Sequence, residues 1–413
     1  MTAAVAEAPI GLEVIEPVTS ELVYQEVIAR GQDLNPLLGA TDEQRRFYGE
    51  MGVKRTGLTT FDGDPTLYKL ELDQESGAFK SRGAAYAVAK AADRNPETTT
   101  AITASAGNHG NGVAIAASRL GLEAVVECAE TVSTVKATNL SNNGATVHAT
   151  HPSLEAGMNT AVEVAEKSSE VAFIHPFDDI DVIAGQSTMG YELLADLLDR
   201  QDNGAFDLRS DPVNVYVPIG GGGLITGVAC AFRWAKDNNL IGEQVRIIGV
   251  QMQGCDAMNR AVDAYRKNEE PQDLFAEGEF NPMADGTAVT KVGKYTLPVV
   301  ADEHFVDSIV TVTEARLYQA MQKTGAEPAG ALATAGILAH GEDNCVNVSL
   351  VTGGNVSYET REYFREAALG AYKKNLDFAR APHWLDDDPT YMEPAEQVIA
   401  TRGIHVASGY SFR

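Results

Sequence analysis

The segment that decides the fold reads Val213-Asn-Val-Tyr-Val-Pro-Ile-Gly-Gly-Gly-Gly-Leu224. Its first five residues alternate as in a β-strand, and the residues after Leu224 have the apolar composition of a buried helix. The glycines between them place several backbone N–H groups at a helix start, which suits a single phosphate. A flexible linker is the alternative, but linkers seldom join an apolar strand directly to an apolar helix. The run lacks the Gly-Lys-Ser/Thr ending of a nucleoside-triphosphate loop and the spacing of a dinucleotide loop.

The same alternation of strand and helix extends outward from this segment in both directions. Strands are predicted at residues 66–72, 98–103, 122–127, 146–148, 245–250 and 345–351. Helices are predicted at residues 21–30, 42–50, 80–92, 113–120, 131–142 and 224–236. Strands that alternate with helices predict an α/β fold in which parallel sheets are flanked by helices.

Length predicts more than one domain, because a single hydrophobic core rarely grows beyond about 300 residues and the chain has 413. We expect a large domain that carries the glycine run, built from residues 56–100 and 181–380. A small domain is expected from residues 101–180. We also expect an N-terminal extension at residues 1–55 and a C-terminal tail at residues 381–413.

Charge and composition exclude several classes of protein. The chain has 58 Asp and Glu residues against 32 Lys and Arg residues, a formal net charge of −26, so no nucleic acid or anionic membrane is expected as a partner. No apolar run approaches the roughly 18 residues of a membrane span, and the first residues lack the basic start of a signal peptide. The four cysteines are far apart and form no zinc motif. We therefore expect a cytoplasmic protein.

Two further loops follow predicted strands, and one lysine precedes a predicted helix. Ser105-Ala-Gly-Asn-His-Gly110 could hold a carboxylate at a helix start, although a capped helix entry is an equally good reason for such residues. Thr352-Gly-Gly-Asn355 is a second candidate loop, although a plain turn that ends a strand would have the same residues. Lys80, which follows an aromatic residue, is a candidate Schiff-base lysine. Such a lysine needs a lowered pKa, whereas most lysines are solvated.

Taken in order, these segments resemble those of the pyridoxal-phosphate (PLP) enzymes of the tryptophan-synthase-β fold. Within that group they are most similar to the threonine/serine ammonia-lyases, also called threonine dehydratases. The resemblance is carried by Ser76-Gly-Ala-Phe-Lys-Ser-Arg-Gly-Ala84, Ser105-Ala-Gly-Asn-His-Gly110, His175-Pro-Phe-Asp-Asp179, Val217-Pro-Ile-Gly-Gly-Gly-Gly-Leu224, Ala284-Asp-Gly-Thr-Ala-Val289, Glu327-Pro-Ala-Gly-Ala331 and Thr352-Gly-Gly-Asn355. The resemblance implies the two-domain fold of that group, with PLP as the cofactor.

The resemblance also implies a role for each segment. Lys80 would hold PLP through a Schiff base and then remove the Cα proton of the substrate, while Phe79 would pack beside the cofactor ring. Asn108 would bind the 3′ oxygen of the ring. The Thr352 hydroxyl would face the ring nitrogen and leave it unprotonated, which favours β-elimination. The phosphate would be held by Gly220, Gly221, Gly222, Gly223 and Leu224. The substrate carboxylate would be held by Ser105, Ala106, Gly107, Asn108 and His109.

Departures from the family narrow the implied activity. Ala106 stands where the related serine racemases have a second serine that acts as acid or base, so racemase activity is not expected. Gln251 and Ala257 stand where some relatives have acidic metal ligands, so no metal site is expected. The chain after Asn355 is short for the regulatory domain of the biosynthetic enzymes, so feedback control by isoleucine is not expected.

The activity implied by the resemblance is PLP-dependent β-elimination from a small β-hydroxy amino acid. L-Threonine would give 2-oxobutyrate and ammonia, and L-serine, as the second choice, would give pyruvate and ammonia. One alternative is threonine synthase or another PLP-dependent β- or γ-eliminating lyase. Another is a PLP- or amino-acid-binding protein that has lost turnover. The usual state of the family implies a homodimer or a higher homo-oligomer.

Overall fold

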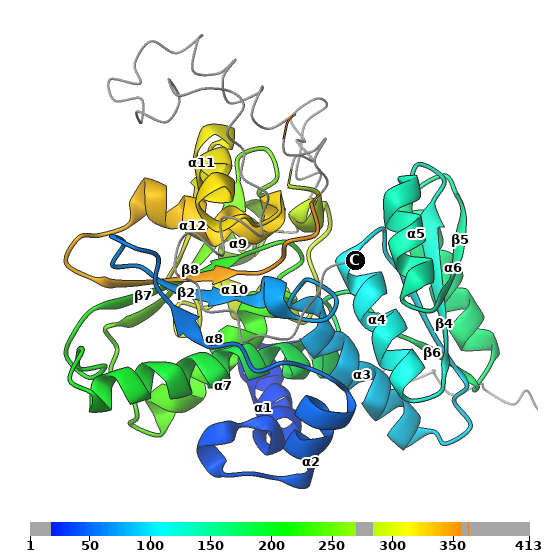
Figure 1. Cartoon of the computed structure of the whole chain (residues 1–413), viewed down its shortest axis with the longest axis horizontal. Coiled ribbons are helices and arrows are strands. Elements are labelled where there is room, and N and C mark those ends of the chain that lie inside the picture. Colours follow the sequence, from blue (N-terminus) through cyan, green and yellow to red (C-terminus); the bar gives the residue numbers. More distant parts are fainter. Residues whose placement is uncertain (1–17, 270–283, 357–361, 363–413) are drawn as a thin grey trace, which may run out of the picture.

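The computed structural model describes residues 18–269, 284–356 and Glu362. Its strands form two sheets, one of six strands in the order β1-β2-β10-β7-β8-β9 and one of four strands in the order β5-β4-β3-β6. Neighbouring strands run parallel, except that β1 and β2 are antiparallel. The helices lie against these sheets (Figure 1), so the predicted α/β architecture is confirmed.

The helices and strands follow one another along most of the described chain. The strands are β1 (Leu58–Thr59), β2 (Leu67–Leu70), β3 (Thr100–Ala104), β4 (Glu123–Ala129), β5 (Ala145–His151), β6 (Val171–Phe173), β7 (Val213–Pro218), β8 (Val245–Met252), β9 (Ser308–Val312) and β10 (Val346–Val351). The α-helices are α1 (Ser20–Gly31), α2 (Asp42–Arg45), α3 (Lys80–Arg94), α4 (Asn108–Arg119), α5 (Thr134–Asn142), α6 (Leu154–Lys167), α7 (Ile180–Asp202), α8 (Gly223–Asp237), α9 (Ala257–Arg266), α10 (Thr296–Ala301), α11 (Glu314–Thr324) and α12 (Pro328–His340).

The six-stranded sheet is buried on both faces, as a parallel sheet requires. Successive side chains of a strand point to opposite faces. In β7, Val215 and Val217 accordingly pack in the cluster that includes α1, α7 and α8, while Tyr216 packs in the cluster that includes α11 and α12. Figure 1 shows these two groups of helices on opposite sides of the sheet. The apolar residues of the strand are therefore shared between two cores.

The four-stranded sheet lies beside the larger one and has its own core. Ala101 of β3 and Val126 of β4 pack with the small residues of α3 and α4. Helices α4, α5 and α6 surround this sheet (Figure 1). The expected small domain, with its boundaries at residues 101 and 180, stays a prediction. The C-terminal tail at residues 381–413 lies outside the described residues.

The N-terminal segment contributes to the large core. Helix α1 begins at Ser20, with the Thr19 hydroxyl accepting a hydrogen bond from the Leu22 N–H. Its buried residues Val23 and Val27 pack in the same cluster as α7 and α8. The helix predicted at residues 42–50 changes character part-way, because α2 is followed by a π-helical turn at Arg46–Glu50. Among the described residues, no helix has both the length and the apolar composition needed to cross a membrane.

Candidate active site

Lys80 is the first residue of α3, and the backbone just before it is hydrogen-bonded to the end of β10. The Phe79 N–H donates to the Thr352 carbonyl at 2.9 Å. The Lys80 Nζ donates to the Pro176 carbonyl at 2.7 Å and lies 5.2 Å from the centre of the Phe79 ring. Burial lowers the pKa of Lys80 to about 8. A substantial fraction of this amine is therefore neutral near pH 8, as a nucleophile or base requires.

The glycine run forms a turn between β7 and α8 that only glycine can make at several positions. Gly222 has φ +94°, a left-handed conformation that side chains other than hydrogen disfavour. A Cβ atom on Gly221 would lie 2.3 Å from the Phe177 ring. The N-cap residue of α8 is Gly222, which has no side chain that could cap the helix. The first N–H groups of this helix, including that of the buried Leu224, are therefore placed to receive an anion.

A second helix start, that of α4, lies at the end of β3. The Ser105 hydroxyl accepts a hydrogen bond from the Gly107 N–H at 3.1 Å, and the Ser105 N–H donates to the Glu127 carbonyl of the neighbouring strand. Helix α4 begins at Asn108, five residues before the predicted start at residue 113, and no side chain caps it. The backbone around Ala106 and Gly107 is therefore a candidate carboxylate site.

The His109 ring contributes less to such a site than its position suggests. Its Nε2 lies 3.2 Å from the Ile174 carbonyl, and since a carbonyl only accepts, this nitrogen carries the proton. Burial, together with the nearby Lys80 charge, lowers the pKa of His109 to about 3. The ring is therefore neutral at physiological pH, and any contact of His109 with a carboxylate would be made by its backbone N–H.

Asn108 is held by two other side chains. Its Nδ2 donates to Glu327 Oε1 at 2.6 Å, and its Oδ1 accepts from Asn355 Nδ2 at 2.8 Å. The Asn355 amide also donates to the Ser76 carbonyl at 2.7 Å, close to Lys80 in the sequence. These contacts fix which end of the Asn108 amide donates and which accepts.

Glu327 is the residue that sequence reasoning missed. It was noted only as the first residue of a matching segment and was given no role. The carboxyl group is buried, and burial raises the pKa of Glu327 to about 7 although the hydrogen bond from Asn108 opposes this. The signal available in the sequence was an acidic residue next to a long apolar stretch, residues 328–338. A carboxyl group that titrates near pH 7 is typical of functional sites.

The structure joins the predicted residues through short connections. Thr352 is buried at the end of β10, and β10 lies between β2 and β7, so the Thr352 and glycine-run loops follow neighbouring strands. Lys80 is linked to the glycine run through Pro176, because Phe177 lies against Gly221. Asn108 reaches the Lys80 segment through Asn355. Ligands of open α/β sheets bind at such carboxyl ends of strands.

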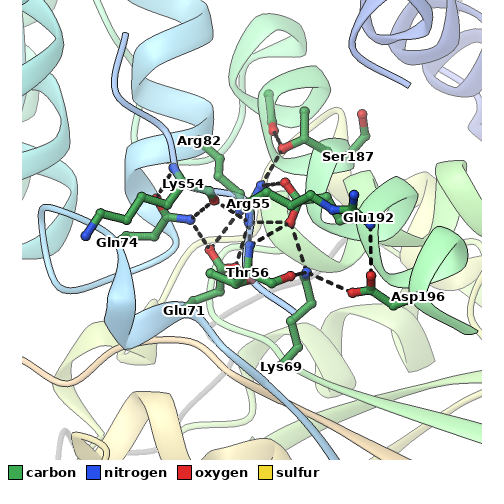
Figure 2. A network of polar contacts seen from close by, with 12 residues as sticks. Lys54, Arg55, Thr56, Lys69, Glu71, Gln74, Arg82, Ser187, Glu192 and Asp196 are labelled. Atoms are coloured by element: carbon green, nitrogen blue, oxygen red, sulfur yellow. Dashed lines mark hydrogen bonds and ion pairs between the residues drawn. The ribbon is translucent and has the colours of Figure 1, made fainter. Parts of the chain in front are cut away.

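A buried ionic network also holds the first turn of α3, through Arg82. Arg82, two residues beyond Lys80, donates to both oxygens of Glu71 and to both oxygens of Glu192. Lys69 donates to Glu192 at 2.9 Å. These four side chains are fully buried, and Figure 2 shows them converging from separate segments of the chain. The first turn of α3 is thereby anchored to β2 and α7.

Comparison with known proteins agrees with this geometry. The family model of the pyridoxal-phosphate dependent enzymes matches residues 53–352. The chain belongs to this family. It is 33% identical over 326 residues to the L-threonine ammonia-lyase of Geobacter sulfurreducens, an alignment that covers 76% of this chain and 73% of the relative.

Solved structures of family members show the same fold. The processed form of threonine deaminase isoform 2 from Solanum lycopersicum superposes with a TM-score of 0.67 at 27% identity, covering 88% of this chain and 98% of that one. Maize serine racemase superposes with a TM-score of 0.63 at 25% identity, covering 85% of this chain and 98% of that one. The chain is therefore a PLP-dependent enzyme of the tryptophan-synthase-β fold.

The residues present fit PLP. The uncapped start of α8 and the glycine run could bind a phosphate, and Lys80 is an amine of lowered pKa that could bind an aldehyde. Asn108 could serve the ring oxygen and Thr352 the ring nitrogen, and these two assignments stay predictions. Among the residues that the structure describes, no three His, Cys, Asp or Glu side chains are grouped to hold a metal ion. That no metal is needed also stays a prediction.

Replacing Gly221 with alanine is expected to weaken PLP binding by about tenfold or more. The new Cβ would overlap the Phe177 ring and force the turn open, and such overpacking costs about 1–3 kcal/mol. Titration of the cofactor-free protein with PLP, followed by absorbance, measures the change. Gly57→Ala is the matched control, because a Cβ at Gly57 meets nothing within 4 Å. Equal affinities of the two variants would contradict the prediction.

Proposed function

We propose that this PLP-dependent enzyme converts L-threonine into 2-oxobutyrate and ammonia, and that L-serine, giving pyruvate and ammonia, is a second substrate. The β-hydroxyl group leaves as water, and hydrolysis of the resulting imine takes up one water, so ammonia is the only net loss. The observation that carries the proposal is a lysine with a pKa near 8 whose amine binds the turn packed against the glycine run at the start of α8, and whose charge acts on His109 at the start of α4. One helix start suits the cofactor phosphate and the other suits the carboxylate of an amino acid. The relatives named above as threonine ammonia-lyase and threonine deaminase support the choice of substrate.

Each step of binding and catalysis would be carried out by particular residues of the chain. Bound PLP supplies an electron sink for the electron pair that remains when the Cα–H bond breaks. Lys80, as a neutral amine, takes the Cα proton. Backbone N–H groups from Ala106 to His109 orient the substrate carboxylate, and the α8 start binds the phosphate. Asn108, with its amide direction fixed by Glu327 and Asn355, donates toward the cofactor ring.

Ala106 favours elimination over racemisation. A racemase needs a second proton-transferring group on the opposite face of the substrate, and the methyl group of Ala106 carries no exchangeable proton. The structural likeness to maize serine racemase concerns the fold and does not by itself support racemase activity. We infer that D-serine is not formed from L-serine at a rate comparable to pyruvate formation.

A panel of amino acids tests the proposal. The purified enzyme with added PLP is incubated with L-threonine, L-serine, D-serine and O-phospho-L-homoserine, and both 2-oxo acid and inorganic phosphate are measured. We expect 2-oxobutyrate from L-threonine with the highest kcat/KM. Phosphate release from O-phosphohomoserine, with no 2-oxo acid from L-threonine, would identify a threonine synthase and overturn the proposal.

Glu327→Gln is expected to flatten the pH dependence of stability between pH 5 and pH 8. The folded-state pKa of Glu327, about 7, is above its unfolded value of about 4.3. The contribution of Glu327 to stability is therefore fully present below its unfolded-state pKa and is lost as pH rises through 7. At about 1.4 kcal/mol per pKa unit, the free energy of unfolding of the wild type falls by about 3 kcal/mol between pH 5 and pH 8 through this group. The glutamine variant does not have this loss. Urea unfolding of both cofactor-free proteins at several pH values measures this, and parallel curves would contradict it.

Assembly and location are further proposals. We infer that the enzyme forms a homodimer or a higher homo-oligomer, and light scattering after size-exclusion chromatography tests this. We also infer a cytoplasmic location, supported by four cysteines that are all free in the structure, three of them buried. Fractionation of the source cells, with detection of the enzyme outside the cytoplasm, would refute that second inference.

A further inference from the structure

The turn at His175–Asp178, between β6 and α7, contacts Lys80, the glycine run and the segment at Lys294–Tyr295. Its Pro176 carbonyl accepts the hydrogen bond from the Lys80 amine at 2.7 Å. Its Phe177 ring lies directly against Gly221 of the glycine run. Its Asp178 carboxylate accepts hydrogen bonds from two successive backbone N–H groups, those of Lys294 and Tyr295. The geometry of this turn therefore sets the surroundings of the lysine and of the glycine run together.

The His175 side chain holds the turn from inside. Its Nδ1 accepts hydrogen bonds from the Phe177 N–H at 3.2 Å and from the Asp178 N–H at 2.8 Å. Its ring packs edge-to-face against Phe173 and Phe177, with centroid distances of 5.9 Å and 4.8 Å. A side-chain acceptor that binds backbone N–H groups two and three residues later is the pattern by which Asp and Asn stabilise turns. In this turn the side-chain acceptor is a histidine.

The double acceptor role requires an unprotonated Nδ1. The pKa of His175 is lowered to about 4, chiefly by burial; the Asp178 charge opposes this, and the Lys80 and Lys294 charges add to it. At neutral pH the ring is therefore uncharged. Because Nδ1 accepts from two donors, the single proton of the ring lies on Nε2. The ring then supports the turn without adding a charge beside the lysine.

We propose that His175 is a positioning residue for Lys80, acting through the backbone of the turn. By binding the Phe177 and Asp178 N–H groups, it fixes the Pro176 carbonyl that holds the Lys80 amine and the Phe177 ring that supports Gly221. The proposal rests on the assignment of Lys80 as the residue that binds PLP. It does not depend on which amino acid is the substrate.

Three substitutions separate this role from simple packing. His175→Asn keeps an acceptor, because the asparagine Oδ1 can occupy the place of the histidine Nδ1. His175→Phe keeps an aromatic ring and loses the acceptor. His175→Ala loses both. If His175 acts through its hydrogen bonds, the Asn variant is close to wild type, and the Phe and Ala variants share the same defect.

The primary readout is covalent attachment of PLP to Lys80 in cofactor-free protein, a reaction of amine and aldehyde that releases water. Absorbance follows its rate, and borohydride reduction with peptide mass analysis locates the label. We expect the Phe and Ala variants to attach PLP at least about tenfold more slowly and the Asn variant to remain within about threefold of wild type. In the loaded enzyme, kcat is expected to fall in parallel while KM for the amino acid changes little.

A second measurement keeps the proposal testable if the Phe or Ala variant fails to fold. In wild-type protein labelled with ¹⁵N-histidine, the His175 ring is expected to be neutral with its proton on Nε2 between pH 5.5 and pH 8. A charged ring at pH 7, or a proton on Nδ1, would overturn the proposal. Attachment rates of the Phe and Ala variants equal to wild type would also overturn it. Attachment at wild-type rate without 2-oxo acid formation would instead refute the proposed function alone.

Discussion

Lys80→Ala is expected to lower kcat for 2-oxo acid formation by on the order of 10³-fold or more. The lysine is asked to do two things, to hold the cofactor covalently and to remove the Cα proton, and loss of a positioned base alone costs about 10²- to 10⁴-fold. Its place at the start of α3, with a pKa near 8, suits both tasks. Borohydride reduction of the wild type is expected to fix PLP on the peptide that contains Lys80, and the variant is expected to carry no label.

Lys90→Ala is the matched control for this experiment. Lys90 lies on the same helix and forms a partly exposed ion pair with Glu43, so its loss removes a lysine from α3 without touching the site. Activity within about twofold of wild type is expected for it, since such ion pairs contribute little. Equal activity of Lys80→Ala and the wild type would mean that the site is not catalytic. It would favour the alternative that the chain only binds PLP or an amino acid.

The elements around the glycine run were predictable because their local pattern and their surroundings agree. Residues 213–217 alternate, and β7 indeed sends alternate side chains into two cores. Helix α7 was not predicted, because its first fifteen residues are buried almost continuously and so carry no apolar–polar period. Helix α4 was predicted to begin at residue 113, because Gly110 and Gly112 weaken helix propensity. It begins at Asn108 because both glycines allow close packing against neighbouring elements.

In the candidate site, too, some residues were predictable from the sequence and others were not. Lys80, the glycine run and Asn108 were proposed because motifs mark them, and the structure places them in one connected region. Glu327 and His175 were quoted within motifs without a role, because the contact of Glu327 is with a distant partner and that of His175 depends on the geometry of a turn. Glu327 meets Asn108 across 219 positions of the chain. His175 accepts hydrogen bonds from the Phe177 and Asp178 N–H groups, two and three positions later, through backbone geometry that no residue pattern reports.

Arg82→Met is expected to lower the free energy of unfolding by about 3–5 kcal/mol. In the wild type, two buried carboxylates, Glu71 and Glu192, face two buried cations, Arg82 and Lys69, so their charges cancel. Without the guanidinium, two carboxylates remain opposite one ammonium in a region closed to water. Urea unfolding at pH 7 measures the loss. Arg55→Met is the control, because the exposed Arg55 pairs with Asp196 at the edge of the same network, and its loss should cost less than about 1 kcal/mol.

Two further measurements decide whether buried charge is the cause of that loss. Adding Glu71→Gln to Arg82→Met leaves Lys69 opposite Glu192, so the double variant should regain part of the stability that the single variant lost. In the wild type burial tends to raise the pKa of Glu192, but the Arg82 and Lys69 charges hold it below its usual range. The stability linked to this lowered pKa is present above the unfolded value of about 4.3 and is lost as pH falls below that value. The difference between Arg82→Met and the wild type should therefore shrink from pH 7 to pH 4. A constant difference, with no recovery in the double variant, would instead point to lost packing of the arginine side chain.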